Sequence, residues 1–253
     1  MRRPEAKSVS PGRNVRPAKA VRRAVKAVRQ AGVLRATSAP HVPTTASAAS
    51  RRAITGHAVV QAARGRGAMR IVGGEFRGRS LATPKSSEIR PTTDRTRESL
   101  FNILAHGYPD AVEGARVLEL FAGTGAVGLE AVSRGARAAT FVENGVEGRG
   151  LIWANIEALG LAGRTRIMRR DATKLGSVGK LEPYDLLFAD PPYGKGLGEK
   201  AIAAAGEGGW LKPDALVILE ETADVSPALP SAFAPLEERE FGDTRMHFYR
   251  YQP

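Results

Sequence analysis

Hydrophobic runs alternate with amphipathic segments over most of the chain after residue 110, and this rhythm predicts strands separated by helices. The predicted strands are residues 116–121, 138–143, 165–169, 185–190 and 215–221, and the predicted helices are residues 125–133 and 146–159. Because parallel strands need crossover connections, strands that alternate with helices indicate a parallel, doubly wound α/β sheet.

The C-terminal end breaks this rhythm. Two strand-like runs, residues 236–241 and 245–251, are joined by Gly242 and Asp243 with no helix between them. A connection this short predicts a hairpin, which brings the total to seven strands and gives the sheet an antiparallel edge.

A shorter patterned segment precedes the alternating region. In residues 69–81, apolar and polar positions alternate on either side of Gly73 and Gly74, which predicts a small hairpin. Further along, Thr92 or Thr93 can cap a helix over residues 94–104. The inward stripe predicted for this helix consists of Leu100, Ile103 and Leu104.

Charge is divided unevenly along the 253 residues. Residues 1–68 hold 15 of the 38 Lys and Arg residues but one acid, Glu5, whereas the remainder holds 23 basic and 25 acidic residues. The net charge of +12 therefore originates in the first 68 residues. A basic balance of this kind does not show that the patterned region binds nucleic acid.

The first 68 residues are rich in Ala, Arg, Ser, Pro and Val and contain no aromatic residue, so we expect them to be disordered. Three interpretations stay open: a basic arm for RNA, an organelle transit peptide, or an extension upstream of a true start at Met69. We divide the remainder into an N-terminal hairpin and helix, residues 69–110, and a main domain, residues 111–253.

Composition excludes several chemistries. The chain has no cysteine, which rules out disulfides, thiolate zinc sites and the cysteine adduct of cytosine C5 methylation. No apolar run approaches the roughly 20 residues that span a bilayer, and no signal peptide opens the chain. We therefore expect a soluble, cytoplasmic protein.

A glycine-rich turn follows the first predicted strand of the main domain. Residues 123–128 have the spacing G-x-G-x-x-G and lie between a strand and a helix, where backbone amides can approach a cofactor. Glu143 ends the second strand, where a carboxylate can accept the ribose hydroxyls of an adenosine-containing cofactor. NAD and S-adenosylmethionine both satisfy these two features.

Two further acids favour S-adenosylmethionine. Glu119 lies just before the turn, where its charge would repel a pyrophosphate but attract an ammonium or sulfonium group. Asp171 follows the third strand and is placed to accept from the adenine amino group; the alternative is that it caps the next segment.

The fourth strand is followed by the tetrapeptide Asp190, Pro191, Pro192 and Tyr193. In open α/β folds, ligand-binding sites lie at this carboxyl end of the strands. An amine conjugated to a base ring has a delocalised lone pair. The Asp190 carboxylate and the Pro191 carbonyl can hold its N–H groups and draw the nitrogen toward tetrahedral geometry. The Tyr193 ring can stack on the base, which must be flipped out or unpaired to be reached.

Several motifs together resemble the RsmD family, the guanine-N2 methyltransferases of small-subunit 16S ribosomal RNA. The resemblance extends over residues 69–253. It rests on residues 71–74, 90–95, 97–102, 119–128, 190–193 and 241–245, of which the Arg-Pro-Thr-Thr-Asp-Arg segment at 90–95 is the most specific.

The resemblance implies a Rossmann-like class I S-adenosylmethionine-dependent methyltransferase without a metal, preceded by a small hairpin and helix that face RNA. Its implied cofactor-binding residues are Glu119, Phe121, Gly123, Gly125, Glu143, Asn144, Asp171 and Ala172. The residues expected to contact the RNA backbone are Arg70, Arg77, Arg79, Arg90, Arg95 and Arg97. The implied partner is 16S rRNA within the small subunit or a late assembly intermediate. We expect the protein to act as a monomer and not to bind a membrane.

Three alternatives stay open. An amine methylase acting on DNA adenine or protein glutamine would share this site, although Asn is favoured there at the position of Asp190. A noncatalytic RNA-binding assembly factor could retain the scaffold. An NAD-dependent oxidoreductase would need a proton relay, and no Tyr-x-x-x-Lys pair stands out.

Overall fold

The computed structural model describes residues 69–253 apart from residues 87, 88 and 90. The predictions made for residues 1–68 lie outside the described residues. The described residues all belong to a single unit of the chain.

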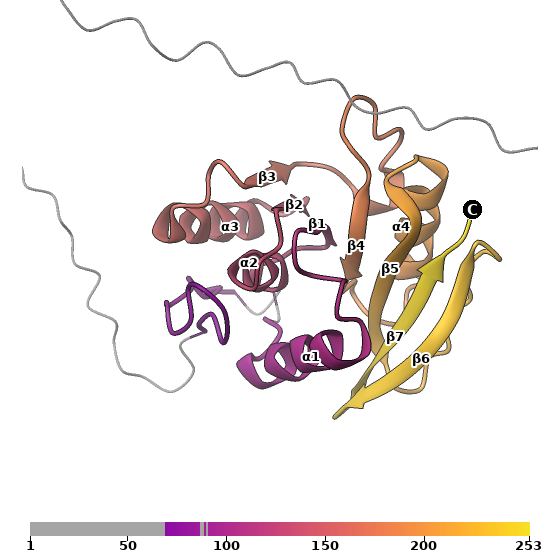
Figure 1. Ribbon diagram of the computed structural model, residues 1–253, viewed down its shortest axis with the longest axis horizontal. Helices are drawn as coiled ribbons and strands as arrows, with labels where there is room; N and C mark the ends of the chain where they lie inside the picture. The colour runs from indigo at the N-terminus through magenta and orange to yellow at the C-terminus, as the bar shows by residue number, and fades with distance from the viewer. Residues whose placement is uncertain (1–68, 87–88, 90) are drawn as a thin grey trace, which may run out of the picture. The chain divides into compact units, whose positions relative to one another are not determined.

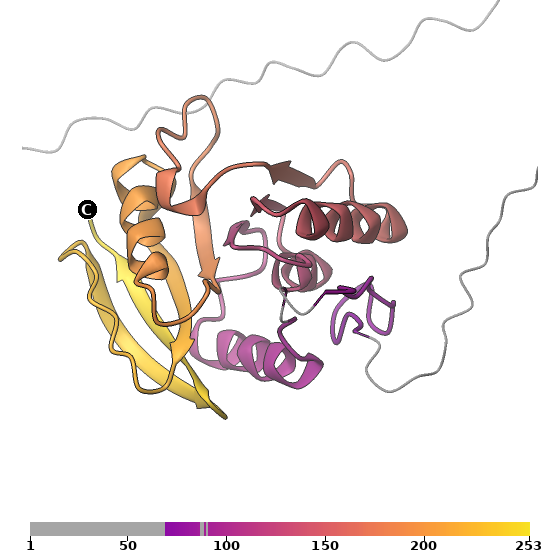
Figure 2. The ribbon, with the colours of Figure 1, turned by 180° about the vertical axis from the view of Figure 1, so that it is seen from behind.

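A seven-stranded mixed sheet forms the centre of the fold, with the strand order β3-β2-β1-β4-β5-β7-β6 (Figure 1). The first five strands run parallel, whereas β7 is antiparallel to both β5 and β6. Their bounds are β1 Arg116–Leu120, β2 Ala138–Val142, β3 Thr165–Met168, β4 Tyr184–Ala189, β5 Leu211–Thr222, β6 Phe233–Phe241 and β7 Thr244–Tyr251. The predicted α/β fold class, the terminal hairpin and the antiparallel edge are confirmed, and the edge is visible from both sides (Figures 1 and 2).

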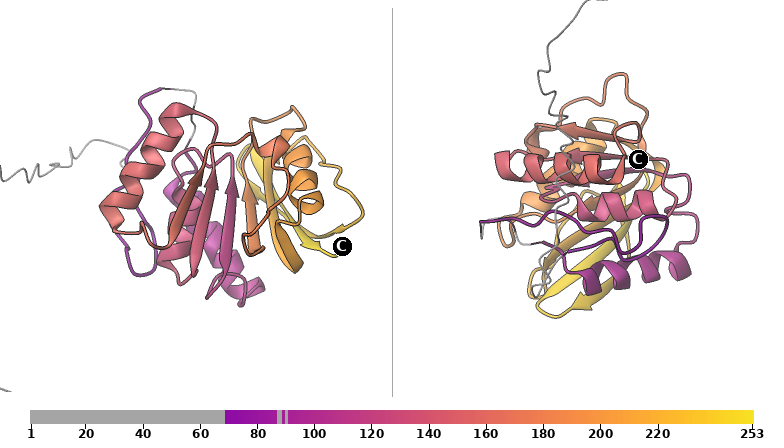
Figure 3. Two further views of the ribbon diagram at one scale, coloured as in Figure 1. Left: turned by 90° about the horizontal axis from the view of Figure 1, so that it is seen from above. Right: turned by 90° about the vertical axis from the view of Figure 1, so that its left-hand side faces the viewer.

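Helices cover both faces of the sheet. The helices α1 (Asp94–Gly107), α2 (Ala126–Ser133) and α3 (Val146–Leu159) contribute to one core cluster, together with residues such as Phe141 and Phe188 from the sheet. The opposite face is covered by α4 (Leu197–Glu207) and the 3-10 helix η1 (Ala172–Lys174) (Figure 3). This arrangement is the doubly wound sandwich that the alternating sequence pattern predicts.

The α4 helix was not among the predicted helices. Its inward residues are Ala201, Ile202 and Ala205, and Gly198 also lies buried within it. A stripe of such small residues gives a weak helical period. The close approach is required, since a Cβ on Gly198 would lie 2.5 Å from a methyl group of Leu219.

The N-terminal segment forms the small hairpin that its pattern predicts. Arg70 and Ser80 form an antiparallel bridge, and the amide of Ile71 donates to the carbonyl oxygen of Arg79. The turn begins at Gly74 (φ 74°), whose carbonyl oxygen accepts from the amide of Arg77. The same glycine also docks on the end of α2, where a Cβ on it would lie 1.9 Å from the carbonyl oxygen of Ser133. Glycine at this position therefore serves both the turn and the contact with a helix.

A buried acid secures this docking. Glu130 of α2 is fully buried and accepts hydrogen bonds from the backbone amides of Val72 (2.8 Å) and Gly73 (2.7 Å). The Glu130 carboxylate also forms a salt bridge with Arg134, one turn along the chain. Because buried carboxylates need such partners, the segment is fixed to the sheet domain.

The α1 helix begins at the predicted place. Thr93 is its N-cap, and its side chain accepts a hydrogen bond from the amide of Thr96. Leu100 and Leu104 are buried as expected, but Phe101 is buried as well and Ile103 only partly. Within the described part of the chain, no helix has both the length and the apolar character to cross a membrane.

Candidate active site

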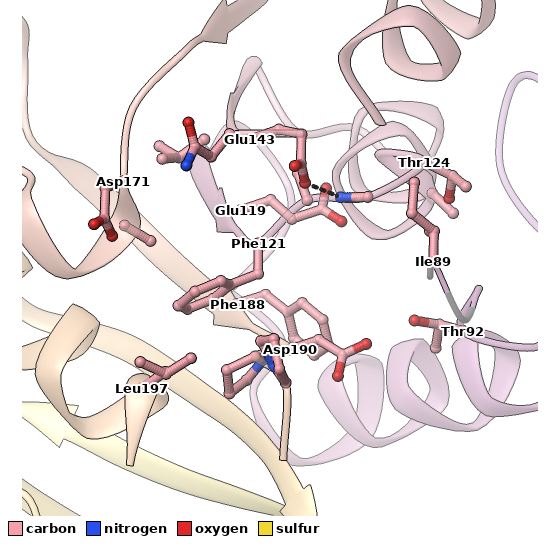
Figure 4. Close-up of a pocket in the computed structure, with 18 of the residues that line it drawn as sticks. Ile89, Thr92, Glu119, Phe121, Thr124, Glu143, Asp171, Phe188, Asp190 and Leu197 are labelled. Carbon is pink, nitrogen blue, oxygen red and sulfur yellow. Dashed lines mark hydrogen bonds between the residues drawn. The ribbon is translucent and has the colours of Figure 1, made fainter. Parts of the chain in front are cut away.

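A cavity of about 600 Å³ opens at the carboxyl ends of the parallel strands (Figure 4). Its walls come from six places along the chain: the segment before α1, the end of β1 with the turn after it, the end of β2, the start of η1, the end of β4 and the start of α4. Among the residues predicted from sequence, those lining it are Glu119, Phe121, Gly123, Glu143, Asn144, Asp171, Ala172, Asp190, Pro191, Pro192 and Tyr193. The fold therefore brings both predicted motifs to one cavity.

The glycine turn shapes the floor of this cavity. Gly123 (φ 52°) and Gly125 (φ 72°) both adopt the left-handed conformation, which residues with a Cβ rarely take. Gly125 caps α2 and does not itself line the cavity. Phe121 is held at φ 56°, a strained conformation for an aromatic residue that is typical of functional sites.

Glu119 lies beneath the turn, almost completely buried. Its Oε2 accepts a hydrogen bond from the amide of Gly128 at 2.7 Å, and a Cβ at Gly128 would clash with the same oxygen. Burial raises the pKa of Glu119 to about 8, and the nearby charge of Asp190 acts in the same direction. The group is therefore ready to ionise when a ligand cation enters the cavity.

We expect the pH dependence of stability to reveal this buried acid. Because the folded pKa of about 8 exceeds the ordinary glutamate value of 4.5, the folded state retains a proton that the unfolded state has lost between these pH values. The free energy of unfolding should thus fall, relative to that of Glu119→Gln, by on the order of 3 kcal/mol as pH rises from about 5 to about 8. Urea denaturation of both proteins measures this, and two parallel pH profiles would contradict it.

Glu143 follows β2 and is held firmly. Its Oε2 accepts from the amide of Gly123 (2.8 Å) and its Oε1 from the amide of Gly145 (2.6 Å). The first bond ties the carboxylate to the glycine turn, as the dashed line in Figure 4 shows. Since each carboxylate oxygen can accept more than one hydrogen bond, Glu143 can also receive the paired hydroxyls of a ribose.

Substitution of Glu143 should weaken cofactor binding. Glu143→Gln has one acceptor oxygen instead of two, so it cannot accept both ribose hydroxyls and both backbone amides. We expect the dissociation constant of the predicted cofactor, S-adenosylmethionine, to rise at least about tenfold. Isothermal titration calorimetry checks this, with Glu157→Gln, an exposed position on α3, as the matched control.

Asp171 has a structural role that the sequence left open. Its Oδ1 accepts from both the amide (2.9 Å) and the hydroxyl (2.7 Å) of Thr173, which lowers the pKa of Asp171 and caps η1. The residue also lines the cavity beside Ala172. Its contact with an adenine amine stays a prediction.

The end of β4 places the tetrapeptide at the other end of the cavity. Asp190 is half-buried, Pro191 is buried and Pro192 is exposed. The Tyr193 hydroxyl donates to Oε1 of Glu220 at 3.2 Å. Burial, followed by the charges of Asp190 and Glu220, raises the pKa of Tyr193 well above its ordinary range. Tyr193 is therefore a neutral phenol.

Among the residues expected to bind RNA, Arg70, Arg77, Arg79 and Arg95 are exposed, and Arg90 lies outside the described residues. The prediction that Arg97 binds RNA is wrong, because its side chain is fully buried. Its guanidinium donates to the carbonyl oxygens of Thr92 and Arg70 and pairs with Asp94 at 2.7 Å. A phosphate cannot reach this group, so Arg97 holds the start of α1 against the N-terminal segment.

Several cavity residues were not predicted from the sequence, among them Ile89, Thr92, Thr124, Arg170, Phe188 and Leu197. Thr92 lies in the segment that most specifically resembles the RsmD family, and Phe188 is two residues before Asp190 on the same face of β4. These two positions carried a usable signal. In the described part of the chain, no cluster of three or more His, Asp or Glu side chains is arranged to hold a metal ion.

The same architecture occurs in a solved structure whose name describes it as a methyltransferase. "Putative methyltransferase yhhF from Escherichia coli" is 36% identical and aligns with a TM-score of 0.63, covering 74% of this chain and 99% of that chain. The seven-stranded sheet, the glycine turn and the cavity at the strand ends define the protein as a class I methyltransferase.

Sequence comparison then identifies the family. Residues 69–250 match the family described as Conserved hypothetical protein 95. Relatives named Ribosomal RNA small subunit methyltransferase D are 37% identical in Escherichia coli K12 (74% of this chain, 91% of the relative) and 31% identical in Haemophilus influenzae (76% and 98%). The chain belongs to this family, and the predicted membership in the RsmD family is confirmed.

Proposed function

We propose that the protein transfers a methyl group from S-adenosylmethionine to the exocyclic N2 amine of a guanine in 16S rRNA of the small ribosomal subunit. The observation that carries the proposal is the meeting of two motifs in one cavity. The glycine turn with Glu143 lies at one end, and Asp190 with Pro191 lies at the other.

The cofactor half of the cavity suits an adenosylated sulfonium compound. Glu143 offers a fixed carboxylate for ribose hydroxyls, and Glu119 offers a buried acid for an ammonium group. A Cβ on Gly123 would lie 3.2 Å from Ile89 in the cavity wall and would narrow the cavity there. Because glycine has no Cβ, a ligand can approach the backbone of the turn. S-adenosylmethionine, when bound, would supply an electrophilic methyl carbon, and the electron pair of the broken C–S bond would stay on the sulfur.

The substrate half supplies the amine chemistry. Asp190 and the Pro191 carbonyl accept the two N–H groups, which frees the nitrogen lone pair to attack the methyl carbon. As the new C–N bond forms, the nitrogen becomes cationic and loses one proton toward Asp190 or solvent. Holding the amine in line with the methyl group supplies much of the acceleration.

The RNA substrate follows from the relatives, which are named as small-subunit ribosomal RNA methyltransferases. The exposed Arg70, Arg77, Arg79 and Arg95 lie in the N-terminal segment and α1, and can contact the phosphate backbone without reading sequence. We further propose that the protein acts in the bacterial cytoplasm as a monomer on assembled or nearly assembled small subunits.

Nucleoside mass spectrometry tests the proposal. Small subunits that lack the modification are incubated with the protein and labelled S-adenosylmethionine, and naked 16S rRNA is treated in parallel. We expect labelled N2-methylguanosine in the subunits and much less in naked RNA. N6-methyladenosine would move the substrate to adenine, and no nucleoside product despite cofactor binding would move it away from rRNA.

A further inference from the structure

The motif at residues 241–245 is connected to the catalytic tetrapeptide through one buried carboxylate. None of these five residues, all of which the structure describes, lines the cavity. Oγ1 of Thr244 donates to Oε1 of Glu220 at 3.0 Å, and the Tyr193 hydroxyl donates to the same oxygen at 3.2 Å. A single oxygen of Glu220 therefore joins the terminal hairpin to the tyrosine that is predicted to stack on the base.

The strand register brings these side chains together. Glu220 of β5 pairs with Met246 of β7, and Thr244 is two residues before Met246, so Glu220 and Thr244 lie diagonally on one face of the sheet. Ala189, the last residue of β4, pairs with Leu219, so the tetrapeptide begins beside Glu220. Glu220 and Thr244 are only 5% and 6% exposed. Their hydrogen bond is thus shielded from competition by water.

The backbone that follows Tyr193 is held by the next acid of β5. Glu221 is buried, and its Oε1 accepts from the amides of Gly194 at 2.9 Å and Thr222 at 3.0 Å. Tyr193 is therefore fixed at two points, the backbone at one end and the hydroxyl at the other. Because a tyrosine side chain has two torsions, a fixed hydroxyl leaves the ring little rotational freedom.

The Tyr193 hydroxyl points away from the cavity that its ring lines, because Tyr193 is a lining residue whereas Glu220 and Thr244 are not. Burial raises the pKa of Tyr193 well above its ordinary range, so the hydroxyl keeps the hydrogen that it donates. The charge of Asp190 contributes to the same rise. Since a phenol has one hydrogen, its donation to Glu220 leaves the acceptor oxygens of Asp190 to the amine.

We propose that Glu220, supported by Thr244, is a positioning residue that holds the Tyr193 ring in the orientation that stacks on the target base. The inference rests on the proposed function. A ring that is fixed before the base enters does not have to be ordered at that moment, so less of the stacking free energy is lost. The motif at residues 241–245 thereby acts on the substrate end of the cavity without touching the substrate.

A double-mutant cycle measures this connection. Tyr193→Phe keeps the ring and removes its hydroxyl, Glu220→Leu removes the acceptor, and a third variant carries both changes. Each protein, at saturating concentration and with labelled S-adenosylmethionine, is mixed with small subunits that lack the modification. The single-turnover rate of N2-methylguanosine formation is measured. Calorimetry with S-adenosylmethionine and urea denaturation show whether each variant is folded.

Each single change is expected to lower the saturating rate about three- to tenfold, which corresponds to the ordering of one released side chain. The variant with both changes should be no slower than the slower single variant, because both changes remove the same hydrogen bond. The protein concentration that gives half the maximal rate should change less than about twofold. Contacts elsewhere on the subunit determine that concentration, and the base enters the cavity afterwards.

Thr244 gives a second test with its own controls. Thr244→Val removes the hydroxyl, which also lies 3.2 Å from the carbonyl oxygen of Phe241, and should lower the same rate about threefold. Thr244→Ser retains the hydroxyl and should match the wild type. Thr222→Val, on the residue that pairs with Thr244, controls for the loss of a threonine hydroxyl in this hairpin and should leave the rate unchanged.

Additive effects of Tyr193→Phe and Glu220→Leu, or a normal rate for Tyr193→Phe, would overturn the inference and leave the proposed function standing. If the wild type forms no N2-methylguanosine on the same subunits, the proposed function fails and the inference fails with it. If Glu220→Leu does not fold, the cycle of Tyr193→Phe with Thr244→Val takes its place, and additivity there has the same meaning.

Discussion

Replacing Asp190 with alanine is expected to lower the rate of methyl transfer at least about 100-fold while the affinity for S-adenosylmethionine changes less than about threefold. Asp190 lies at the substrate end of the cavity, away from Glu143 and the glycine turn (Figure 4). Its loss removes an acceptor that orients the amine and stabilises the charge that develops on the nitrogen. Hydrogen bonds of this kind typically contribute a hundredfold or more to rate.

Three measurements decide this prediction. Single-turnover transfer to small subunits gives the rate, calorimetry gives the cofactor affinity, and urea denaturation shows whether the variant is folded. Asp224→Ala, at an exposed position after β5, controls for the loss of one acid. A folded Asp190→Ala protein with near-normal transfer would show that Asp190 does not hold the amine.

The second large effect concerns stability. Arg97→Ala is expected to lower the free energy of unfolding by roughly 3 kcal/mol, because it removes a fully buried guanidinium and leaves its carbonyl and carboxylate partners without it. Arg95, two residues earlier on the same helix, is exposed. Arg95→Ala should change stability by less than about 0.5 kcal/mol.

The same two variants should behave in the opposite way toward RNA. If Arg95 contacts a phosphate, its removal weakens binding at low salt and reduces the slope of log affinity against log salt by about 1. Arg97→Ala, measured where it is still folded, should leave that slope unchanged. A reduced slope for Arg97→Ala would restore the original assignment of Arg97 to the RNA surface.

This pair of arginines shows the limit of inference from sequence. Both belong to a basic segment before and within α1, and residue type alone cannot separate them. The structure does, because Arg97 faces the carbonyl of Arg70, 27 residues earlier in the chain. Burial of a polar side chain depends on such distant partners, which no local pattern contains.

Gly73 and Gly74 make a related point for the backbone. Two adjacent glycines between alternating residues are typical of a hairpin turn, and the turn does begin at Gly74. The sequence does not show that the same glycines also lie against Ser133 and Arg134 at the end of α2. Glycine permits both a tight turn and a close approach, so its presence does not reveal that both are used.

The sequence by itself determined the alternating strands and helices, the terminal hairpin, and the two motifs that line the cavity. These features depend on residues close together in the chain: the period of apolar positions, the glycines after β1 and the tetrapeptide after β4. Only the tertiary structure decided that Arg97 is buried, that Asp171 caps η1, and that Glu220 accepts hydrogen bonds from the hydroxyls of Tyr193 and Thr244. Hydrogen bonds of polar side chains are set by strand register and by packing between distant segments, and these are properties of the folded chain.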